Sequence, residues 1–332
     1  MTKVDIISGF LGAGKTTLIK KLLQEAFVGE KLVLIENEFG EIGIDGVIFK
    51  DYGIEIKEMN SGCICCTIAG DFSLALKEIL KLYQADRIII EPSGVGKLSD
   101  VIKGCEQFIK DEAISLNICM TVVDGMKYNM YMKNFAEFYK DQIINAKTIL
   151  LSKTQFMNSD AIEIIRKDIK RYNPSVMIVT TDWGQIDGNK IVELAENAEE
   201  VKLENIILKE LYLRQYPSKL IVKALPRKIN AKFKGKLQKE LHHADEVFSV
   251  WGKETTKIYD SNRLEEMLDE LEKVQGFILR AKGIIQIENN GWVQFDYVPG
   301  ESTIIEAKAD FTGRICVIGE LINELELSKL FE

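Results

Sequence analysis

Along the first half of the chain, short apolar runs alternate with stretches in which apolar residues recur every three or four positions. The runs predict strands and the periodic stretches predict helices. The predicted strands are Val4–Ser8, Leu32–Glu36, Arg87–Glu91, Leu116–Val123, Thr148–Leu151 and Val176–Thr180. The predicted helices are Lys15–Ala26, Asp71–Gln84, Ser99–Lys110, Asn134–Asn145 and Ser159–Tyr172. This alternation is typical of an α/β domain whose mainly parallel sheet is covered on both faces.

The pattern changes near residue 200, where acidic residues gather and apolar ones become sparse. Beyond it, strand-like runs follow one another with few helices between them, which predicts a smaller α+β domain with an antiparallel sheet. The strands are placed at Lys219–Ala224, Glu246–Trp251, Phe277–Ile287, Trp292–Tyr297 and Ile315–Ile318, the helices at Leu264–Val274 and Leu321–Leu330, and a hairpin turn at Asn289-Asn290-Gly291. We therefore predict two domains, residues 1–200 and 205–332, as suits a chain of 332 residues.

A glycine-rich phosphate loop joins the first predicted strand to the first predicted helix. The residues from Gly9 to Thr16 fit the pattern G-x-x-x-x-G-K-[ST] in the strand–turn–helix context that it needs. Glycines let backbone N–H groups curl around phosphates, and the helix N-terminus favours their charge. Lys15 should reach the outer phosphates, and the Thr16 hydroxyl should bind Mg²⁺. The predicted nucleotide contacts are Gly9, Gly12, Ala13, Gly14, Lys15, Thr16 and Thr17.

Two further segments fit a nucleotide-dependent switch. Glu91 ends an apolar strand and is followed three residues later by Gly94. A carboxylate there can hold the Mg²⁺ shell, and the Gly94 N–H can sense the outermost phosphate. The polar, glycine-punctuated segment after the second strand, with Glu38, Glu41 and Asp45, lies where a phosphate-sensing loop is expected. Asp45 and Glu41 are candidates for positioning the attacking water.

The segment Ser152-Lys153-Thr154-Gln155 follows a predicted strand at the position where GTPases carry Asn-Lys-x-Asp. The aspartate of that pattern accepts two hydrogen bonds from guanine, and the lysine stem packs on the ring. A glutamine amide oxygen still accepts a hydrogen bond, but its NH₂ group does not. Losing the charged acceptor weakens discrimination between bases by about 1–3 kcal/mol. Lys153 and Gln155 are thus predicted base contacts, with GTP, ATP or both as ligands.

Cys63, Cys65 and Cys66 lie within four residues, just before a predicted helix. Three thiols so placed can occupy three of the four tetrahedral positions around Zn²⁺ or Co²⁺. An incomplete ligand set suits a carrier, because the open position allows the ion to be handed over. The fourth ligand could be Glu36, Glu38, Glu41, water or a client's side chain. A redox-active disulfide is an alternative interpretation, as are inert buried cysteines.

Composition narrows the classes of function. The chain carries a formal charge of −8, which argues against nucleic acid as a partner. It holds no run of 18 apolar residues and no signal-peptide pattern at its start, so neither a membrane nor secretion is expected, and the cytoplasm is the expected compartment.

Taken together, these motifs resemble the CobW-type P-loop GTPases, relatives of the HypB and UreG nickel chaperones. The resemblance rests on Gly9–Thr17, Glu36–Glu41, Asn60–Cys66 and Ile90–Gly94 in that order. In the second half it rests on Arg280-Ala-Lys-Gly283 followed by a hairpin with Trp292. It implies slow, Mg²⁺-dependent GTP hydrolysis coupled to delivery of a divalent metal, Zn²⁺ above all, to a client metalloprotein. Its partners would be GTP and GDP, the metal and the client, with a homodimer as an additional candidate assembly.

Two other classes of function compete with this interpretation. The chain could be a nucleotide-gated switch that activates a client metalloenzyme or corrinoid protein without carrying metal. It could also be a small-molecule kinase, but the sequence shows no acceptor pocket or lid.

Overall fold

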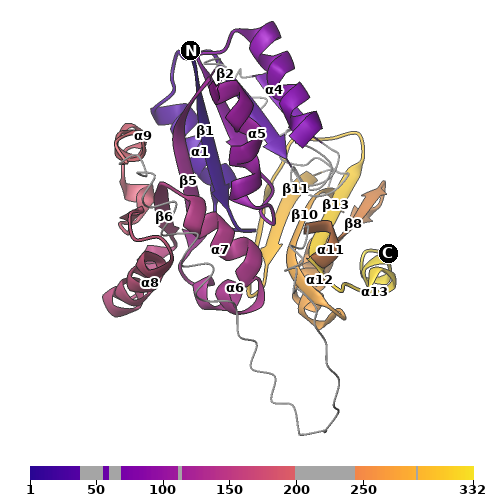
Figure 1. The fold of residues 1–332 in the computed structure, drawn as a ribbon. Helices are drawn as coiled ribbons and strands as arrows, with labels where there is room; N and C mark the ends of the chain where they lie inside the picture. Colours follow the sequence, from indigo (N-terminus) through magenta and orange to yellow (C-terminus); the bar gives the residue numbers. More distant parts are fainter. Residues whose placement is uncertain (38–54, 60–68, 111–113, 199–243, 289–290) are drawn as a thin grey trace, which may run out of the picture.

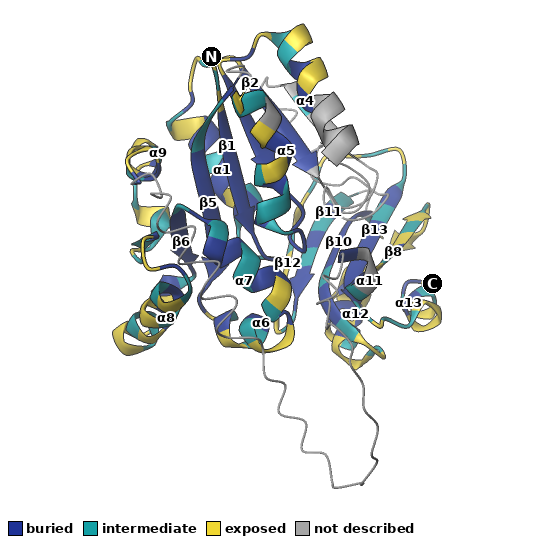
Figure 2. Ribbon diagram, in the orientation of Figure 1, coloured by how far each residue is buried: buried dark blue, intermediate teal, exposed yellow. Residues whose placement is uncertain are grey.

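The first half of the chain forms a seven-stranded, fully parallel sheet (Figure 1). The computed structural model describes residues 1–37, 55–59, 69–110, 114–198, 244–288 and 291–332. Across the sheet, the strands are β3 (Glu55–Met59), β2 (Leu32–Asn37), β4 (Arg87–Glu91), β1 (Thr2–Gly9), β5 (Ile114–Asp124), β6 (Thr148–Ser152) and β7 (Met177–Val179). Strands β4 and β6 are buried along their whole length, as expected for a parallel sheet covered on both faces (Figure 2).

Helices cover both faces of this sheet. One face packs against α1 (Lys15–Glu25) and α9 (Gly188–Glu196), through side chains such as Leu18 and Ile191. The other face carries α4 (Ala69–Tyr83), α5 (Leu98–Lys110), α6 (Tyr128–Asn134), α7 (Ala136–Asn145) and α8 (Ser159–Tyr172). The predicted α/β arrangement with a parallel sheet is therefore confirmed.

The second half forms a separate six-stranded sheet that is antiparallel apart from one short strand. Its main path is β12 (Glu301–Glu306), β11 (Gly291–Val298), β10 (Phe277–Ile287), β13 (Gly313–Glu320) and β8 (Ser249–Thr255), with β9 (Ile258–Tyr259) beside β10. The helical elements are α11 (Ala244–Val247), α12 (Ser261–Glu270) and α13 (Glu324–Leu330). One sheet face packs against α12 and α13 through Leu264, Leu268 and Leu327. This confirms the predicted α+β second unit.

Three predicted elements were wrong in extent. The helix predicted at Asn134–Asn145 begins at Ala136, because Phe135 leaves helical geometry and Asn134 ends the preceding helix α6. Residues 246–247, predicted to begin a strand, end helix α11. The last helix begins at Glu324 rather than Leu321, because Leu321 has a positive φ of 53° and Asn323 caps the helix by accepting from two N–H groups.

The structure also adds elements that the hydrophobic pattern did not reveal: β3, α6, β9, α9 and β12. The predicted strand Lys219–Ala224 and the turn residues Asn289 and Asn290 lie outside the described residues.

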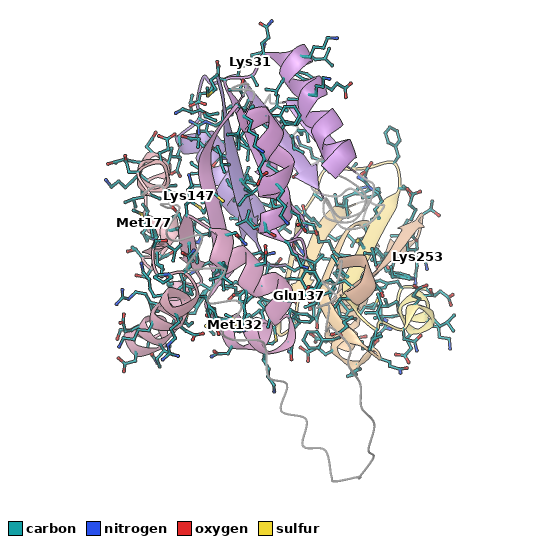
Figure 3. All side chains as sticks on the ribbon, in the orientation of Figure 1. Lys31, Met132, Glu137, Lys147, Met177 and Lys253 are labelled. Atoms are coloured by element: carbon teal, nitrogen blue, oxygen red, sulfur yellow. The ribbon has the colours of Figure 1, made fainter. Side chains whose placement is uncertain are left out.

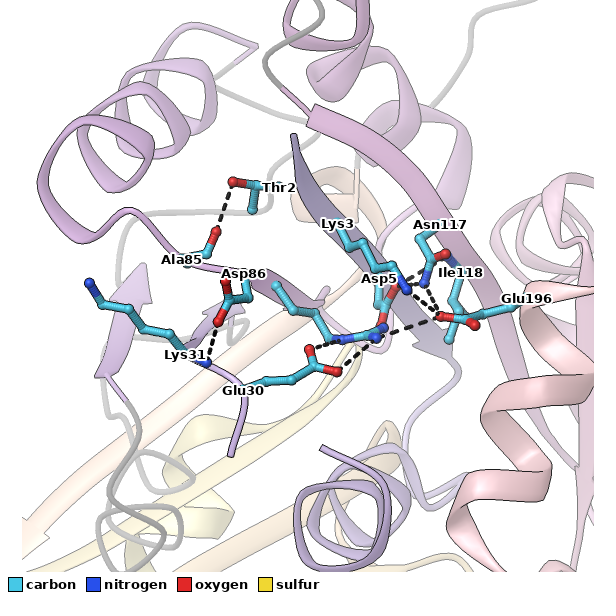
Figure 4. A network of polar contacts seen from close by, with 11 residues as sticks. Thr2, Lys3, Asp5, Glu30, Lys31, Ala85, Asp86, Asn117, Ile118 and Glu196 are labelled. Carbon is cyan, nitrogen blue, oxygen red and sulfur yellow. Dashed lines mark hydrogen bonds and ion pairs between the residues drawn. The ribbon is translucent and has the colours of Figure 1, made fainter. Parts of the chain in front are cut away.

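A buried polar network lies toward the amino ends of the parallel strands, away from the phosphate loop (Figure 4). Arg87, at the start of β4, places Nη1 2.5 Å from Oδ2 of Asp5 on β1, and both side chains are almost inaccessible to solvent. The same guanidinium bonds Glu30 and lies over the ring of Phe27. Asp5 also accepts from Asn117 on β5, so the network ties three neighbouring strands together.

An aromatic cluster joins the two halves of the molecule. Phe10, inside the phosphate loop, packs against Tyr131 and Phe135 of the first half and Phe248 of the second, with ring centroids 4.6, 5.5 and 6.5 Å away. Phe135 contacts Phe277 as well, at 5.8 Å. The conformation of the phosphate loop therefore depends on side chains from the second half.

We expect Phe248→Leu to lower the free energy of unfolding by about 1–2 kcal/mol, because the ring contacts at this junction are lost while most of the volume is kept. Nucleotide affinity should fall as well, since Phe10 loses a neighbour. Urea unfolding and nucleotide titration measure the two effects. Phe311→Leu, at a fully exposed ring, is the matched control. Equal effects of the two substitutions would contradict the assigned role of the cluster.

Candidate nucleotide site

The phosphate loop lies between the end of β1 and the start of α1. Gly12 and Gly14 have positive φ angles of 68° and 104°, a conformation that side chains disfavour. At Gly9, a Cβ would lie 2.5 Å from the carbonyl oxygen of Val122 on β5. Lys15 is buried at the first position of α1. The predicted glycines are thus needed for the shape of the loop, and the loop has the geometry of a phosphate cradle.

The two predicted Mg²⁺ ligands lie together. Oγ1 of Thr16 donates to Oε1 of Glu91 over 3.0 Å, although 75 residues separate them. Glu91 is buried at the end of β4 and lies beside Glu36, its register partner on β2. A hydroxyl and a carboxylate beside a phosphate cradle are the oxygen donors that Mg²⁺ prefers, so these residues fit that ion.

Side-chain contacts hold the loop after Glu91 against helix α7. The buried Gln142 amide donates to the carbonyls of Gly94 and Gly96 over 3.0 and 2.8 Å. Lys97 bonds Glu137 over 2.7 Å. Glu137 also lies on α7, where Figure 3 labels it. A Cβ at Gly94 would come within 2.9 Å of the Leu11 backbone nitrogen, so this loop packs directly on the phosphate loop. Gly94 therefore lies directly beside the phosphate loop.

The predicted base-binding segment lies at the carboxyl end of β6. The Ser152 hydroxyl donates to the carbonyl of Ala13 over 2.8 Å and so ties this strand to the phosphate loop. Lys153 has a left-handed backbone and lies 3.2 Å from the buried carboxylate of Asp124. Gln155 is exposed and lines a pocket that Lys153 also lines. The segment therefore lies beside the phosphate loop, as a base site requires.

A cavity of about 550 Å³ runs from the phosphate loop to this segment, which is large enough for a nucleotide. Several residues that line this cavity were not predicted from the sequence. Trp183 lies beside the loop, since its Cζ2 would be 3.6 Å from a Cβ on Gly14. The second sheet supplies Arg280, Gln294, Asp296, Val298, Glu301, Thr303 and Ile305.

The other predicted site residues lie outside the described part of the chain. These are Glu38, Asp45, Cys63, Cys65 and Cys66. Their attachment points are described: the segment containing Glu38 and Asp45 follows Asn37, and the cysteine segment follows Met59. Asn37 and Met59 are register partners on β2 and β3. Both segments therefore begin at the carboxyl ends of their strands, which is the end of the sheet where Glu91 lies.

Comparison with known proteins decides the family. Residues 3–180 match the CobW/HypB/UreG nucleotide-binding domain, and residues 248–332 match the cobalamin synthesis protein CobW C-terminal domain. The chain belongs to the CobW/HypB/UreG family. The first match holds the phosphate loop, Glu91 and the predicted base segment, and the second match holds the cavity residues that the second sheet of this CobW/HypB/UreG protein supplies.

Several curated proteins are similar to this CobW/HypB/UreG chain. The zinc chaperones YeiR and YjiA of Escherichia coli are 29% and 32% identical over 57% and 55% of this chain and 58% of their own lengths. The zinc chaperone CobW of a Sinorhizobium species is 32% identical over 49% of this chain and 54% of its own length. The chain thus matches less than two thirds of each relative.

Two solved structures resemble the chain at lower sequence identity. Zn(II)-bound YjiA GTPase from E. coli has 22% identity and a TM-score of 0.46, with 99% of this chain and 98% of that chain covered. HypB from Helicobacter pylori in complex with nickel has 16% identity and a TM-score of 0.42, with 66% of this chain and 90% of that chain covered. Within the described residues, no helix of this protein is long and apolar enough to cross a membrane.

Proposed function

We propose that this protein is a GTP-dependent metallochaperone that couples slow GTP hydrolysis to the delivery of Zn²⁺ to a client metalloprotein. The proposal rests on one juxtaposition. The segment with Cys63, Cys65 and Cys66 begins at the edge of the sheet that holds the Thr16–Glu91 pair. The three relatives described above are zinc chaperones by name, which favours Zn²⁺ over Co²⁺ as cargo.

The described residues support the proposed nucleotide chemistry. Lys15 and the loop N–H groups would offset the charge on the outer phosphates, which is the main source of catalysis in phosphoryl transfer. Thr16 and Glu91 would hold Mg²⁺, which when bound neutralises charge between the phosphates. Gln142 would keep the Gly94 loop against the phosphate loop. Asp45 is the proposed residue for positioning the attacking water.

Sheet register suggests how nucleotide and metal sites communicate. The order β3-β2-β4 leaves only β2 between Met59 and Glu91. Neighbouring strands are about 4.8 Å apart, so the two strand ends are separated by roughly 10 Å. A change near Glu91 when the outermost phosphate is lost can thus affect the cysteine ligands or Glu38 over a short distance. We propose that Mg²⁺–GTP strengthens metal binding and that hydrolysis weakens it.

Titration of Zn²⁺ and Co²⁺ into the reduced, full-length protein tests this function. We expect 1:1 binding, thiolate charge-transfer absorption with Co²⁺, and an affinity that differs by about fivefold or more between Mg²⁺–GDP and a Mg²⁺–GTP analogue. The variant with Cys63, Cys65 and Cys66 replaced by alanine should lose the signal. Cys105→Ala is the matched control, because burial raises the pKa of that thiol to about 12 and keeps it from acting as a thiolate ligand.

Equal metal affinity in both nucleotide states would contradict the coupling. Absence of cysteine-dependent metal binding would instead favour the second candidate, a nucleotide-gated activator of a client metalloprotein that carries no metal itself.

A further inference from the structure

One face of the second sheet is polar where it meets the nucleotide pocket. Gln294, Asp296 and Val298 alternate along β11, and Glu301 and Thr303 follow on β12. The intervening residues Phe295 and Tyr297 point to the opposite face and are buried in the core around α12. The period of two along these strands thus turns one set of side chains to the core and the other to the nucleotide pocket.

The β11–β12 hairpin is held against the phosphate loop at its tip. Val298 packs on Gly12 so closely that its Cγ1 would be 2.4 Å from a Cβ at that glycine. Val298 and Glu301 are the last register pair of the two strands, so the packing of Val298 also sets the position of Glu301. The carboxylate of Glu301 is thereby placed at a defined point beside the phosphate loop.

Two lysines of the first half hold this carboxylate. Lys153 forms a short ion pair with Oε2 of Glu301, and Lys127 lies 3.8 Å from the same oxygen. Burial lowers the pKa of Lys153, but the bond to Glu301 and the charge of Asp124 outweigh that effect, so the pKa is raised and the lysine stays charged. Both contacts use Oε2, so Oε1 is available to accept from a ligand, and the Glu301 side chain is 47% exposed.

The base-binding segment itself lacks such an acceptor, since Gln155 stands where GTPases carry aspartate. We propose that Glu301 supplies from the second domain the carboxylate that reads the guanine edge. Its Oε1 would accept from guanine N1–H or the 2-amino group, while Lys153 orients the carboxylate. This inference rests on the proposed GTP-dependent function and adds a specificity-determining residue to it.

Displacement of a fluorescent GDP by GTP, XTP and ATP tests the assignment. Glu301→Gln exchanges an acceptor for a donor, which no longer suits the guanine 2-amino group but suits the C2 carbonyl of xanthine. We expect GTP affinity to fall about 10- to 100-fold and XTP affinity to rise about tenfold, with ATP unchanged. Glu306→Gln, the same charge change at the other end of β12, should alter none of the three.

Each result has a separate meaning. A gain for XTP cannot come from damage to the fold, so it would establish that Glu301 faces the base. If Glu301→Gln changes all three affinities by the same factor, or none, Glu301 only pairs with Lys153 and the inference is wrong. If the unaltered protein binds no guanine nucleotide, the proposed function fails as well.

Discussion

Replacing Lys15 with alanine is expected to lower the rate of GTP hydrolysis, the activity proposed here, by about 10²- to 10³-fold or more. Lys15 is 5% exposed, follows Gly14 at the start of α1 and lines the nucleotide pocket. An ammonium in that position stabilises charge that develops on the outer phosphates, and no solvent cation replaces it in a buried site. Phosphate release under single-turnover conditions measures the loss.

The control for Lys15 lies on the same helix. Lys21 pairs with Glu25 over 2.8 Å and does not line the pocket, so Lys21→Ala should leave hydrolysis within about twofold. Circular dichroism on both variants shows whether α1 is retained. Hydrolysis that survives Lys15→Ala would remove the phosphate loop from the proposed mechanism, even if nucleotide still binds.

The second large effect concerns stability. Arg87→Met is expected to cost about 3–5 kcal/mol of unfolding free energy, because it leaves the carboxylate of Asp5 buried without its cation. Asp5 would keep its bonds from Asn117 and the Ile118 N–H, at 2.9 and 3.2 Å, which prevents a larger loss. Urea unfolding at neutral pH measures the change.

The pH dependence of this variant follows from the same burial. Burial already raises the pKa of Asp5, against the opposing charge of Arg87. Without the arginine the pKa should rise further. A raised carboxyl pKa in the folded state means that acid favours folding at that group, so the deficit should shrink as the pH falls through that raised pKa toward the ordinary value of an aspartate.

Lys3→Met provides the comparison. Lys3 contacts Glu196, which Arg87 also approaches, but the lysine side chain is 46% exposed. Surface pairs of this kind contribute less than about 1 kcal/mol. Similar losses from the two substitutions would show that burial of the Arg87–Asp5 pair has no special weight.

The phosphate site could be predicted from the sequence because its determinants are local. The glycines and Lys15 lie within eight consecutive residues, and a strand and a helix on either side confirm the context. Glu91 could be placed from the apolar strand that it ends. The walls from β11 and β12 could not, because alternating polar residues on a strand are equally typical of a face in contact with solvent.

Some helix boundaries could not be predicted from the sequence, for a related reason. Helix α6 was not predicted, and the predicted helix began at Asn134, where α6 ends; Phe135, which separates α6 from α7, packs against Phe10, Phe248 and Phe277. Such contacts span more than a hundred positions of the chain and leave no local signal. The parallel sheet itself was predictable, since several of its strands hold short apolar runs, such as Ile88–Ile90 of β4 and Ile149–Leu151 of β6.

The seating of Val298 on Gly12 has a consequence for how this protein can change over evolution. Two segments that match separate family domains line one cavity, so a substitution at the tip of the β11–β12 hairpin changes the proposed nucleotide site as directly as one in the phosphate loop. The halves are therefore not interchangeable modules. A chimaera that joins the first half of this chain to the second half of a distant relative should inherit a mismatched cavity, and residues 12 and 298 should be found to vary together rather than independently.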